Sequence, residues 1–254
     1  MAVSGGAGRR ALVVTHAEGE GPGLLAEWLP GAGLELDVLR PWAGDDVPSA
    51  VGQHDALVVL GGPYEAYDDD SAPWLAPTKA LLRSAYEQRV PVLGICLGAQ
   101  LLAEATGGVV EPGESGPELG ARLVGKRDVA GADPLVWETP MSWICVQWHA
   151  DAITELPPGA TLLASSSRYP HQAYRLGTRA WGLQFHVEAT EAMVRGWAEQ
   201  SRRELTEAGL DVDALVARTL VELDDVRELW RPVLERFVAV VRGEDPRPTA
   251  LPLV

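Results

Sequence analysis

The sequence predicts an α/β fold with a central, mostly parallel sheet flanked by helices, and three changes of pattern along the chain support this. In the first half, short apolar runs alternate with segments of helical periodicity, as in parallel strands joined by right-handed crossovers. After residue 108 the extended pieces are short and separated by glycine and proline, which favours antiparallel strands. Beyond residue 189, charges alternate with Leu, Val and Trp at helical spacing. We therefore expect an α/β domain with an antiparallel β extension over residues 1–189 and a helical extension over residues 190–254.

Turn residues bound the elements of the first half. The expected strands are residues 11–15, 34–39, 55–60 and 90–95, and the expected helices are residues 24–29, 72–89 and 97–106, with a loop at residues 18–23. The third strand runs directly into Gly61 and Gly62, where a ligand can approach the backbone closely because there are no side chains. This glycine loop is a candidate piece of a site.

The second half is expected to begin with short strands and to end in helices. The strands are residues 119–124, 135–137, 143–149, 161–165, 172–176 and 181–186, and the helices are residues 191–208, 211–223 and 225–241. Pro232 lies near the start of the last helix or kinks it. These helices either pack against the core or dock a partner, and packing is the favoured interpretation. The proline-containing residues 244–254 are expected to be a loose tail.

Composition limits the possible functions. The chain has 254 residues, of which 46% are hydrophobic, enough to bury a large core. Its 36 acidic and 21 basic residues give a net charge of −15, which argues against a nucleic-acid partner. No apolar run is long enough for a secretory signal or a membrane span, so a cytoplasmic location is expected. Histidine and cysteine never recur at metal-ligand spacing, and we expect no metal or other cofactor.

Cys96 lies at the joint between a predicted strand and a predicted helix. Gly94 and Gly98 stand two residues before and two after it, as in a nucleophile elbow, where a strained turn needs small neighbours. The helix that starts at Leu97 directs its positive dipole end at the sulfur, which favours the thiolate. The alternative is a buried structural thiol in a glycine-rich turn. Cys145, inside an apolar run, is expected to be a core residue.

His186 and Glu188 end the last predicted strand. Residues two apart on an extended segment share a face, so the carboxylate can orient the imidazole while the imidazole accepts a thiol proton. A histidine alone would more often be a structural residue with a satisfied hydrogen bond. Together with Cys96, the pair indicates a Cys-His-Glu catalytic triad.

Three motifs in this order resemble the class I, triad-type glutamine amidotransferase domains: GGP at 61–63, GICLGAQ at 94–100 and QFHVE at 184–188. The resemblance spans residues 11–189 and is strongest to the amidotransferase half of GMP synthase. It implies a flavodoxin-like fold and an enzyme whose cysteine attacks the side-chain amide of L-glutamine. Cys96 would form a glutamyl thioester, His186 would shuttle the proton and Glu188 would orient His186.

The same resemblance implies further site residues. The backbone amides of Gly61, Gly62 and Leu97 would form an oxyanion hole, and Gln100 would contact bound glutamine. Residues 146–151 resemble the stretch that holds the substrate's α-amino and α-carboxylate groups, which makes substrate-binding candidates of three further residues: Gln147, Trp148 and His149. His149 has a structural role as its alternative, and the three other histidines are expected at the surface or in the core: His16, His54 and His171. Ala99 departs from the histidine common in this family, outside the triad.

Three classes of function follow. The first is a glutaminase that supplies ammonia to a separate acceptor enzyme, because residues 190–254 contain no glycine- and serine-rich phosphate loop of a synthetase. The second is a stand-alone hydrolase of another γ-glutamyl amide or conjugate. The third, a non-catalytic binding or regulatory module, is disfavoured because all three triad residue types are present.

Overall fold

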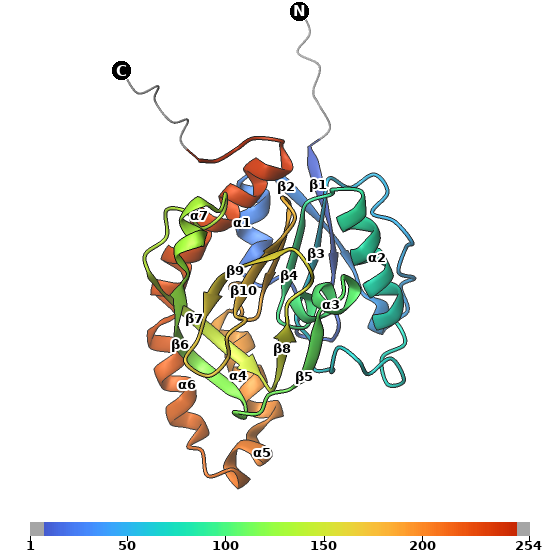
Figure 1. Cartoon of the computed structure of the whole chain (residues 1–254). Helices are drawn as coiled ribbons and strands as arrows, with labels where there is room; N and C mark the ends of the chain where they lie inside the picture. The colour runs from blue at the N-terminus through green and yellow to red at the C-terminus, as the bar shows by residue number, and fades with distance from the viewer. Residues whose placement is uncertain (1–7, 248–254) are drawn as a thin grey trace, which may run out of the picture.

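The computed structural model describes residues 8–247, which form an α/β fold with two sheets (Figure 1). The larger sheet has nine strands in the order β2-β1-β3-β4-β11-β10-β9-β6-β7. These strands are β1 (Arg9–Val14), β2 (Leu34–Leu39), β3 (Ala56–Val59), β4 (Val92–Ile95), β6 (Glu118–Lys126), β7 (Ser142–His149), β9 (Ala160–Ser165), β10 (Ala173–Leu176) and β11 (Ala180–Leu183). The second sheet pairs β5 (Val109–Pro112) antiparallel with β8 (Asp151–Glu155), and the sequence pattern revealed neither strand.

The pairing of neighbouring strands changes once across the larger sheet, from parallel to antiparallel. From β2 to β11 the neighbouring strands are parallel, and from β11 to β7 they are antiparallel. The predicted fold class, with its antiparallel extension, is confirmed. The helices are α1 (Leu25–Gly31), α2 (Leu75–Glu87), α3 (Leu97–Ala105), α4 (Glu191–Gln200), α5 (Arg202–Glu207), α6 (Val212–Val221) and α7 (Leu223–Val241), with short 3-10 turns at Pro41–Ala43 and Asp128–Ala132.

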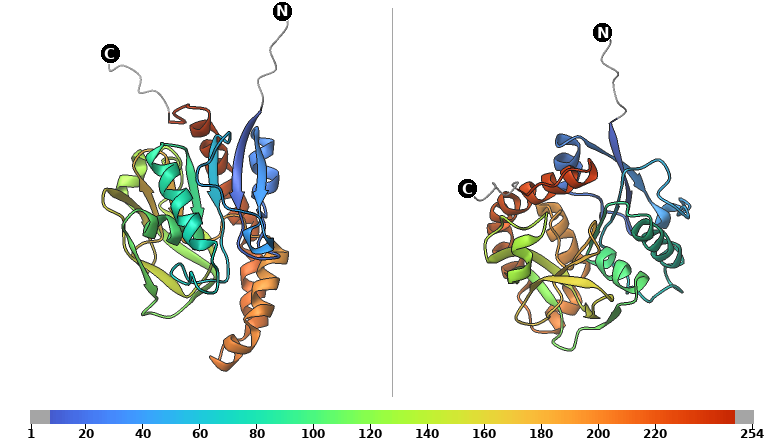
Figure 2. Two further views of the ribbon diagram at one scale, coloured as in Figure 1. Left: turned by 90° about the vertical axis from the view of Figure 1, so that its right-hand side faces the viewer. Right: turned by 45° about the horizontal axis from the view of Figure 1, so that its top comes forward.

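Helices cover both faces of the parallel strands. On β1, Ala11 and Val13 join the apolar cluster that includes α1 and α7, whereas Leu12 and Val14 join the cluster that includes α2 and α3. Successive side chains of a strand point to opposite faces, so a strand that is apolar at every position is buried on both sides. In Figure 2 the helices α1, in blue, and α2, in teal, lie on opposite sides of these strands.

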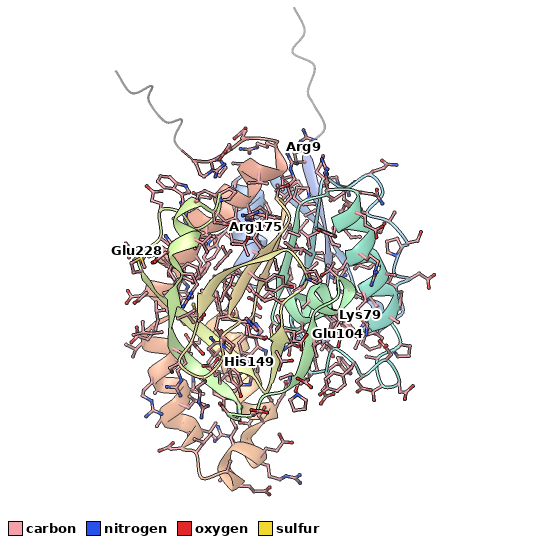
Figure 3. The ribbon with its side chains drawn as sticks, viewed as in Figure 1. Arg9, Lys79, Glu104, His149, Arg175 and Glu228 are labelled. Carbon is pink, nitrogen blue, oxygen red and sulfur yellow. The ribbon has the colours of Figure 1, made fainter. Side chains whose placement is uncertain are left out.

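The helix that follows Cys96 is held firmly against its neighbours. Almost every residue of α3 is buried. A partly buried ion pair joins α2 to α3, with Lys79 Nζ 3.2 Å from Glu104 Oε2 (Figure 3). On the inner side, the hydroxyl of Tyr174 on β10 donates to the Ala99 carbonyl at 2.7 Å. The start of α3 is therefore fixed relative to the sheet.

The predicted strand at residues 181–186 needs two corrections. β11 ends at Leu183, and the backbone bends from residue 184 to residue 188. It pairs antiparallel with β10 but parallel with β4, because the β10–β11 hairpin returns the chain in the direction of the parallel strands. β11 therefore ends beside the strand that leads into Cys96.

Residues 135–137 form a turn, so the predicted strand there is wrong. The buried Asp133 side chain accepts the backbone N–H of Leu135 at 2.9 Å and of Val136 at 3.4 Å. Its carbonyl accepts the N–H of Trp137 at 3.0 Å. A side-chain cap of this kind competes with extended structure, and the apolar composition of the segment conceals it.

The C-terminal helices share a core with the sheet. Trp230 of α7 is fully buried, with its ring centroid 5.4 Å from that of Trp143 and 5.0 Å from that of Phe185.

The single helix predicted over residues 191–208 is wrong at Ser201, whose backbone leaves helical geometry (φ −95°, ψ 3°) between α4 and α5. Pro232 lies inside α7 on its exposed side. The division at residues 189 and 190 into two domains stays a prediction.

Among residues 8–247, no helix is both long and apolar enough to cross a membrane.

Of the predicted tail, residues 248–254 lie outside the described residues. Within the remainder, Arg247 Nη1 donates to the Ala132 carbonyl at 2.8 Å, so the start of the tail contacts the body of the protein.

Candidate active site

Four neighbouring parallel strands end at one edge of the sheet, and the candidate site lies there. β1, β3, β4 and β11 lead into His16, Gly61, Cys96 and His186 within three residues of their last positions. Ligands of open parallel sheets bind outside the carboxyl ends of the strands. The topology therefore brings together the three motifs that are far apart in the sequence.

Cys96 has the strained backbone of a nucleophile elbow. Its φ of +50° is in a region that non-glycine residues seldom occupy. Cys96 occupies the N-cap position of α3. A Cβ atom at Gly94 would lie 2.5 Å from the Gly98 carbonyl oxygen, and one at Gly98 would collide with the Val59 carbonyl oxygen. Both glycines are therefore required by close backbone packing, as the sequence predicts.

His186 and Glu188 form a buried pair beside Cys96. His186 Nδ1 lies 2.7 Å from Glu188 Oε1, and the two side chains are 3% and 2% exposed. The contact forms across the bend after β11, where the His186 N–H donates to the Val146 carbonyl at 2.8 Å, so the expected extended segment is not its cause. Burial opposes the imidazolium, but the charges of Glu188 and Cys96, and hydrogen bonds to both, raise the pKa of His186 well above its ordinary value.

The glycine loop contacts both Cys96 and His186. A Cβ atom at Gly61 would lie 2.8 Å from His186 Cε1 and 3.5 Å from Cys96 Cβ, and one at Gly62 would lie 3.1 Å from Leu97 Cδ2. Leu97 is the first residue of α3, so its backbone N–H has no partner inside the helix. The candidate oxyanion-hole residues thus lie around Cys96.

Gln100 and Trp148 line the cavity in front of Cys96 and His186. This cavity has a volume of about 410 Å³. The Gln100 side chain donates to the Asp151 carbonyl at 3.3 Å and to Gln184 Oε1 at 3.2 Å, and Gln184 Nε2 lies 3.9 Å from Cys96 Sγ. Gln184, to which the sequence assigned no role, therefore links Gln100 to the sulfur.

His149 and Gln147 belong to a buried polar network behind the cavity. His149 Nε2 lies 3.3 Å from Glu118 Oε2, and Gln147 Nε2 donates to Gln172 Oε1 at 2.7 Å (His149 is labelled in Figure 3). Gln172 in turn donates to Glu118 at 2.6 Å. Burial opposes ionisation of Glu118, but hydrogen bonds from His149, Ser166 and Gln172 lower its pKa. His149 lines the cavity, whereas Gln147 does not.

Two residues besides Gln184 escaped the sequence analysis. Glu20, in the β1–α1 loop, and Trp197, on α4, both line the cavity. The Trp197 ring lies 4.5 Å from the His186 ring and 5.9 Å from the Trp148 ring, measured between centroids. The rule that sites form at the carboxyl ends of parallel strands would have drawn attention to the loop that contains Glu20. No local pattern distinguishes Trp197 from a core residue.

His16 is a further buried group near the glycine loop. Trp74 Nε1 donates to His16 Nδ1 at 3.1 Å, and burial lowers the pKa of His16 to about 4. His16 is therefore neutral at neutral pH.

Both cysteines are free, and burial raises the pKa of Cys145 well above its ordinary value. Within residues 8–247, no group of three or more His, Cys, Asp or Glu side chains could hold a metal ion.

Comparison with known proteins identifies the class. The family model for class-I glutamine amidotransferases matches residues 29–193, more than half of the chain. The chain belongs to the class-I glutamine amidotransferase family. Its fold is also that of a solved glutamine amidotransferase from Thermotoga maritima, with a TM-score of 0.81 and 30% identity over 92% of this chain and 99% of that one.

Individual relatives differ in their described activities. The chain is 30% identical to the glutamine amidotransferase-like protein YfeJ of Salmonella typhimurium, over 77% of this chain and 82% of that protein. It is 32% identical to the glutamine-hydrolysing GMP synthase of Ectopseudomonas mendocina, over 81% of this chain but only 36% of the synthase. It is 31% identical to γ-glutamyl peptidase 4 of Arabidopsis thaliana, over 54% of each. The family is thus shared by proteins named for different reactions.

Proposed function

We propose that the protein is a Cys-His-Glu amidohydrolase that cleaves the side-chain amide of L-glutamine, giving glutamate and ammonia. The observation that carries this proposal is the position of a strained cysteine, at the start of a helix, next to the buried His186–Glu188 pair. Membership of the glutamine amidotransferase family supports the same reaction.

The proposed reaction proceeds in two halves. The Cys96 sulfur attacks the amide carbon, and the carbonyl oxygen becomes an oxyanion that accepts the backbone N–H groups of Leu97 and of the glycine loop. His186 holds the proton taken from the thiol and gives it to the leaving nitrogen as the carbon–nitrogen bond breaks. Water then attacks the thioester and gives a proton to His186. The carbon–sulfur bond breaks, glutamate leaves, and the proton returns to Cys96.

The proposed substrate contacts lie around the cavity. Gln100 and Trp148 would contact the glutamyl chain, and His149 would fix the turn that leads to Asp151 through its Nδ1 contact with the Asp151 carbonyl at 2.8 Å. The Asp151 carboxylate would accept hydrogen bonds from the α-ammonium group of the substrate. Gln147 would support this wall through Gln172 rather than touch substrate.

A second candidate reaction is hydrolysis of another γ-glutamyl amide. It is favoured by the extent of the cavity, whose walls include Gln200, Ser201 and Glu204 from the end of α4 and the start of α5. These residues line the same cavity as Cys96 and His186, so the cavity could hold a released group larger than ammonia. The likeness to γ-glutamyl peptidase 4 supports the same candidate.

A substrate panel tests the proposed function. Purified full-length protein, without a partner, is given L-glutamine, γ-glutamyl peptides and γ-glutamyl amines, and released glutamate is measured. An ammonia donor for a separate acceptor enzyme in the cytoplasm is expected to hydrolyse glutamine slowly alone and faster with that enzyme. Rapid turnover of one conjugate, with glutamine far behind, would favour the second candidate. No glutamate from any substrate would contradict both.

A further inference from the structure

The cavity that contains Cys96 and His186 is also lined by residues from the β1–α1 loop, α4 and α5. His186 must reach the leaving nitrogen to protonate it, so any group attached to that nitrogen lies near the imidazole. Three of the additional lining residues are Trp197, whose ring centroid lies 4.5 Å from that of His186, Glu20 from the β1–α1 loop, and Glu204 from α5. This region is called the leaving-group pocket below.

Glu20 is a buried acid that lines the leaving-group pocket. Its residue is only 8% exposed, and burial is the largest cause that raises its pKa. The nearby Glu188 raises the pKa further, whereas His186 and a hydrogen bond from Trp197 lower it. No Lys or Arg among residues 8–247 forms an ion pair with Glu20. Burial disfavours the charged form of Glu20, and a cationic ligand beside it would favour that form.

The rest of the cavity contains further carboxyl groups. Its lining includes four carboxylates and no lysine or arginine: Glu20, Glu65, Asp151 and Glu204. Asp151 Oδ2 is buried and has no hydrogen-bond partner within the described residues. Trp148 and Trp197, whose ring centroids lie 5.9 Å apart, also line the cavity. Such a lining favours a ligand with an additional positive charge over one with an additional negative charge.

We propose that the preferred substrate is a γ-glutamyl amide with two positive charges, one on its α-ammonium group and one on an ammonium group at the far end of the leaving amine, as in a γ-glutamyl diamine. This rests on the proposed Cys96 hydrolysis. Asp151 would take the α-ammonium group of the glutamyl half. Glu20 and Glu204 would take the distal ammonium group beside Trp197. Attack by Cys96 breaks the carbon–nitrogen bond, His186 gives its proton to the released nitrogen, and water converts the thioester to glutamate.

Three amides with the same carbon chain test the charge preference. These are γ-glutamyl-diaminobutane, γ-glutamyl-butylamine and γ-glutamyl-aminobutyrate, whose distal ends are cationic, neutral and anionic. The full-length protein is expected to give a kcat/KM at least about tenfold higher for the cationic than for the neutral amide, and lowest for the anionic one, since a partly buried ion pair is worth tenfold or more.

Variants locate the preference in the leaving-group pocket. Glu20→Gln is expected to lower the ratio of cationic to neutral kcat/KM by about tenfold, and Glu204→Gln by less, because Glu204 is exposed. Glu207→Gln is the matched control, since it removes the same charge from α5 at an exposed position outside the cavity. It is expected to leave the ratio unchanged.

The outcomes separate this inference from the proposed function. Equal kcat/KM for the three amides in the wild-type protein, with glutamate released, would overturn the charge preference and leave the hydrolase standing. Release of glutamate from no substrate would overturn the hydrolase itself. If Glu20→Gln does not fold, the wild-type ratios and Glu204→Gln still decide. A cationic preference that Glu207→Gln abolishes and Glu204→Gln does not would also overturn the assignment to this pocket.

Discussion

His186 lies between Glu188 and Cys96 in a site that is almost closed to solvent. Burial alone would lower its pKa, yet the charges of its two neighbours outweigh burial and raise that pKa. The raised pKa favours the protonated imidazole, which in the proposed reaction would hold the proton taken from Cys96. Glu188 has a second, buried oxygen without a partner among the described residues, so its contact with His186 is its principal one.

This arrangement gives His186 and Glu188 unequal roles. His186→Asn removes the proton carrier and is expected to lower kcat/KM by at least about 10³-fold, whereas Glu188→Gln, which keeps a hydrogen-bonding side chain, is expected to cost about 10- to 100-fold. The measurement is steady-state hydrolysis of the best substrate from the panel. His54→Asn is the control, because His54 contacts Asp37 at 2.8 Å outside the cavity. A loss for Glu188→Gln as large as that for His186→Asn would contradict these roles.

At the scale of elements, the turn between β4 and α3 depends on backbone contacts that no larger side chain permits. Gly94 and Gly98 pack against each other, and Gly98 also packs against the end of β3. The turn therefore fixes Cys96 relative to two strands at once. Its strain is maintained because β4, α3 and β3 are buried around it.

Gly98→Ala tests this turn. The added Cβ would collide with the Val59 carbonyl oxygen, and overpacking against backbone is expected to lower the free energy of unfolding by about 3 kcal/mol and to reduce activity strongly. Gly196→Ala is the control on α4, where a Cβ would have open space; it should stabilise the helix by about 0.5–1 kcal/mol. Denaturant unfolding with an activity assay measures both. Wild-type stability and activity in Gly98→Ala would show that the turn is not so constrained.

At the scale of the whole molecule, the sheet assembles the site from loops far apart in sequence. The three motifs and the elements around them could be predicted, because buried strands, glycine turns and a strand-end histidine have local signatures. The separate β5–β8 sheet, the turn capped by Asp133 and the placement of Trp197 could not. The β5–β8 sheet and the Trp197–His186 contact join segments far apart in the sequence, and the apolar residues after Asp133 conceal the turn.

The same assembly buries His16 and makes stability depend on pH. Unfolded histidine has a pKa near 6.5, whereas the pKa of folded His16 is about 4, so the unfolded chain binds more protons between these values. The contribution of neutral His16 to the free energy of unfolding is therefore complete above pH 6.5 and is lost as the pH falls toward 4. The loss is about 3 kcal/mol at most. Unfolding free energies across this range should fall less steeply in His16→Gln than in the wild type. Identical pH dependence in the two proteins would contradict the assignment.

The central claim is that Cys96 forms the covalent glutamyl intermediate. The most direct measurement is peptide mapping by mass spectrometry after reaction of the native protein with a glutamine-mimicking electrophile. We predict one adduct, on Cys96, and none on Cys145, whose buried thiol has a raised pKa. Cys96→Ala should remain folded, stay unlabelled and lose at least about 10³-fold in turnover. An adduct on Cys145 or elsewhere, or substantial hydrolysis by Cys96→Ala, would contradict the claim.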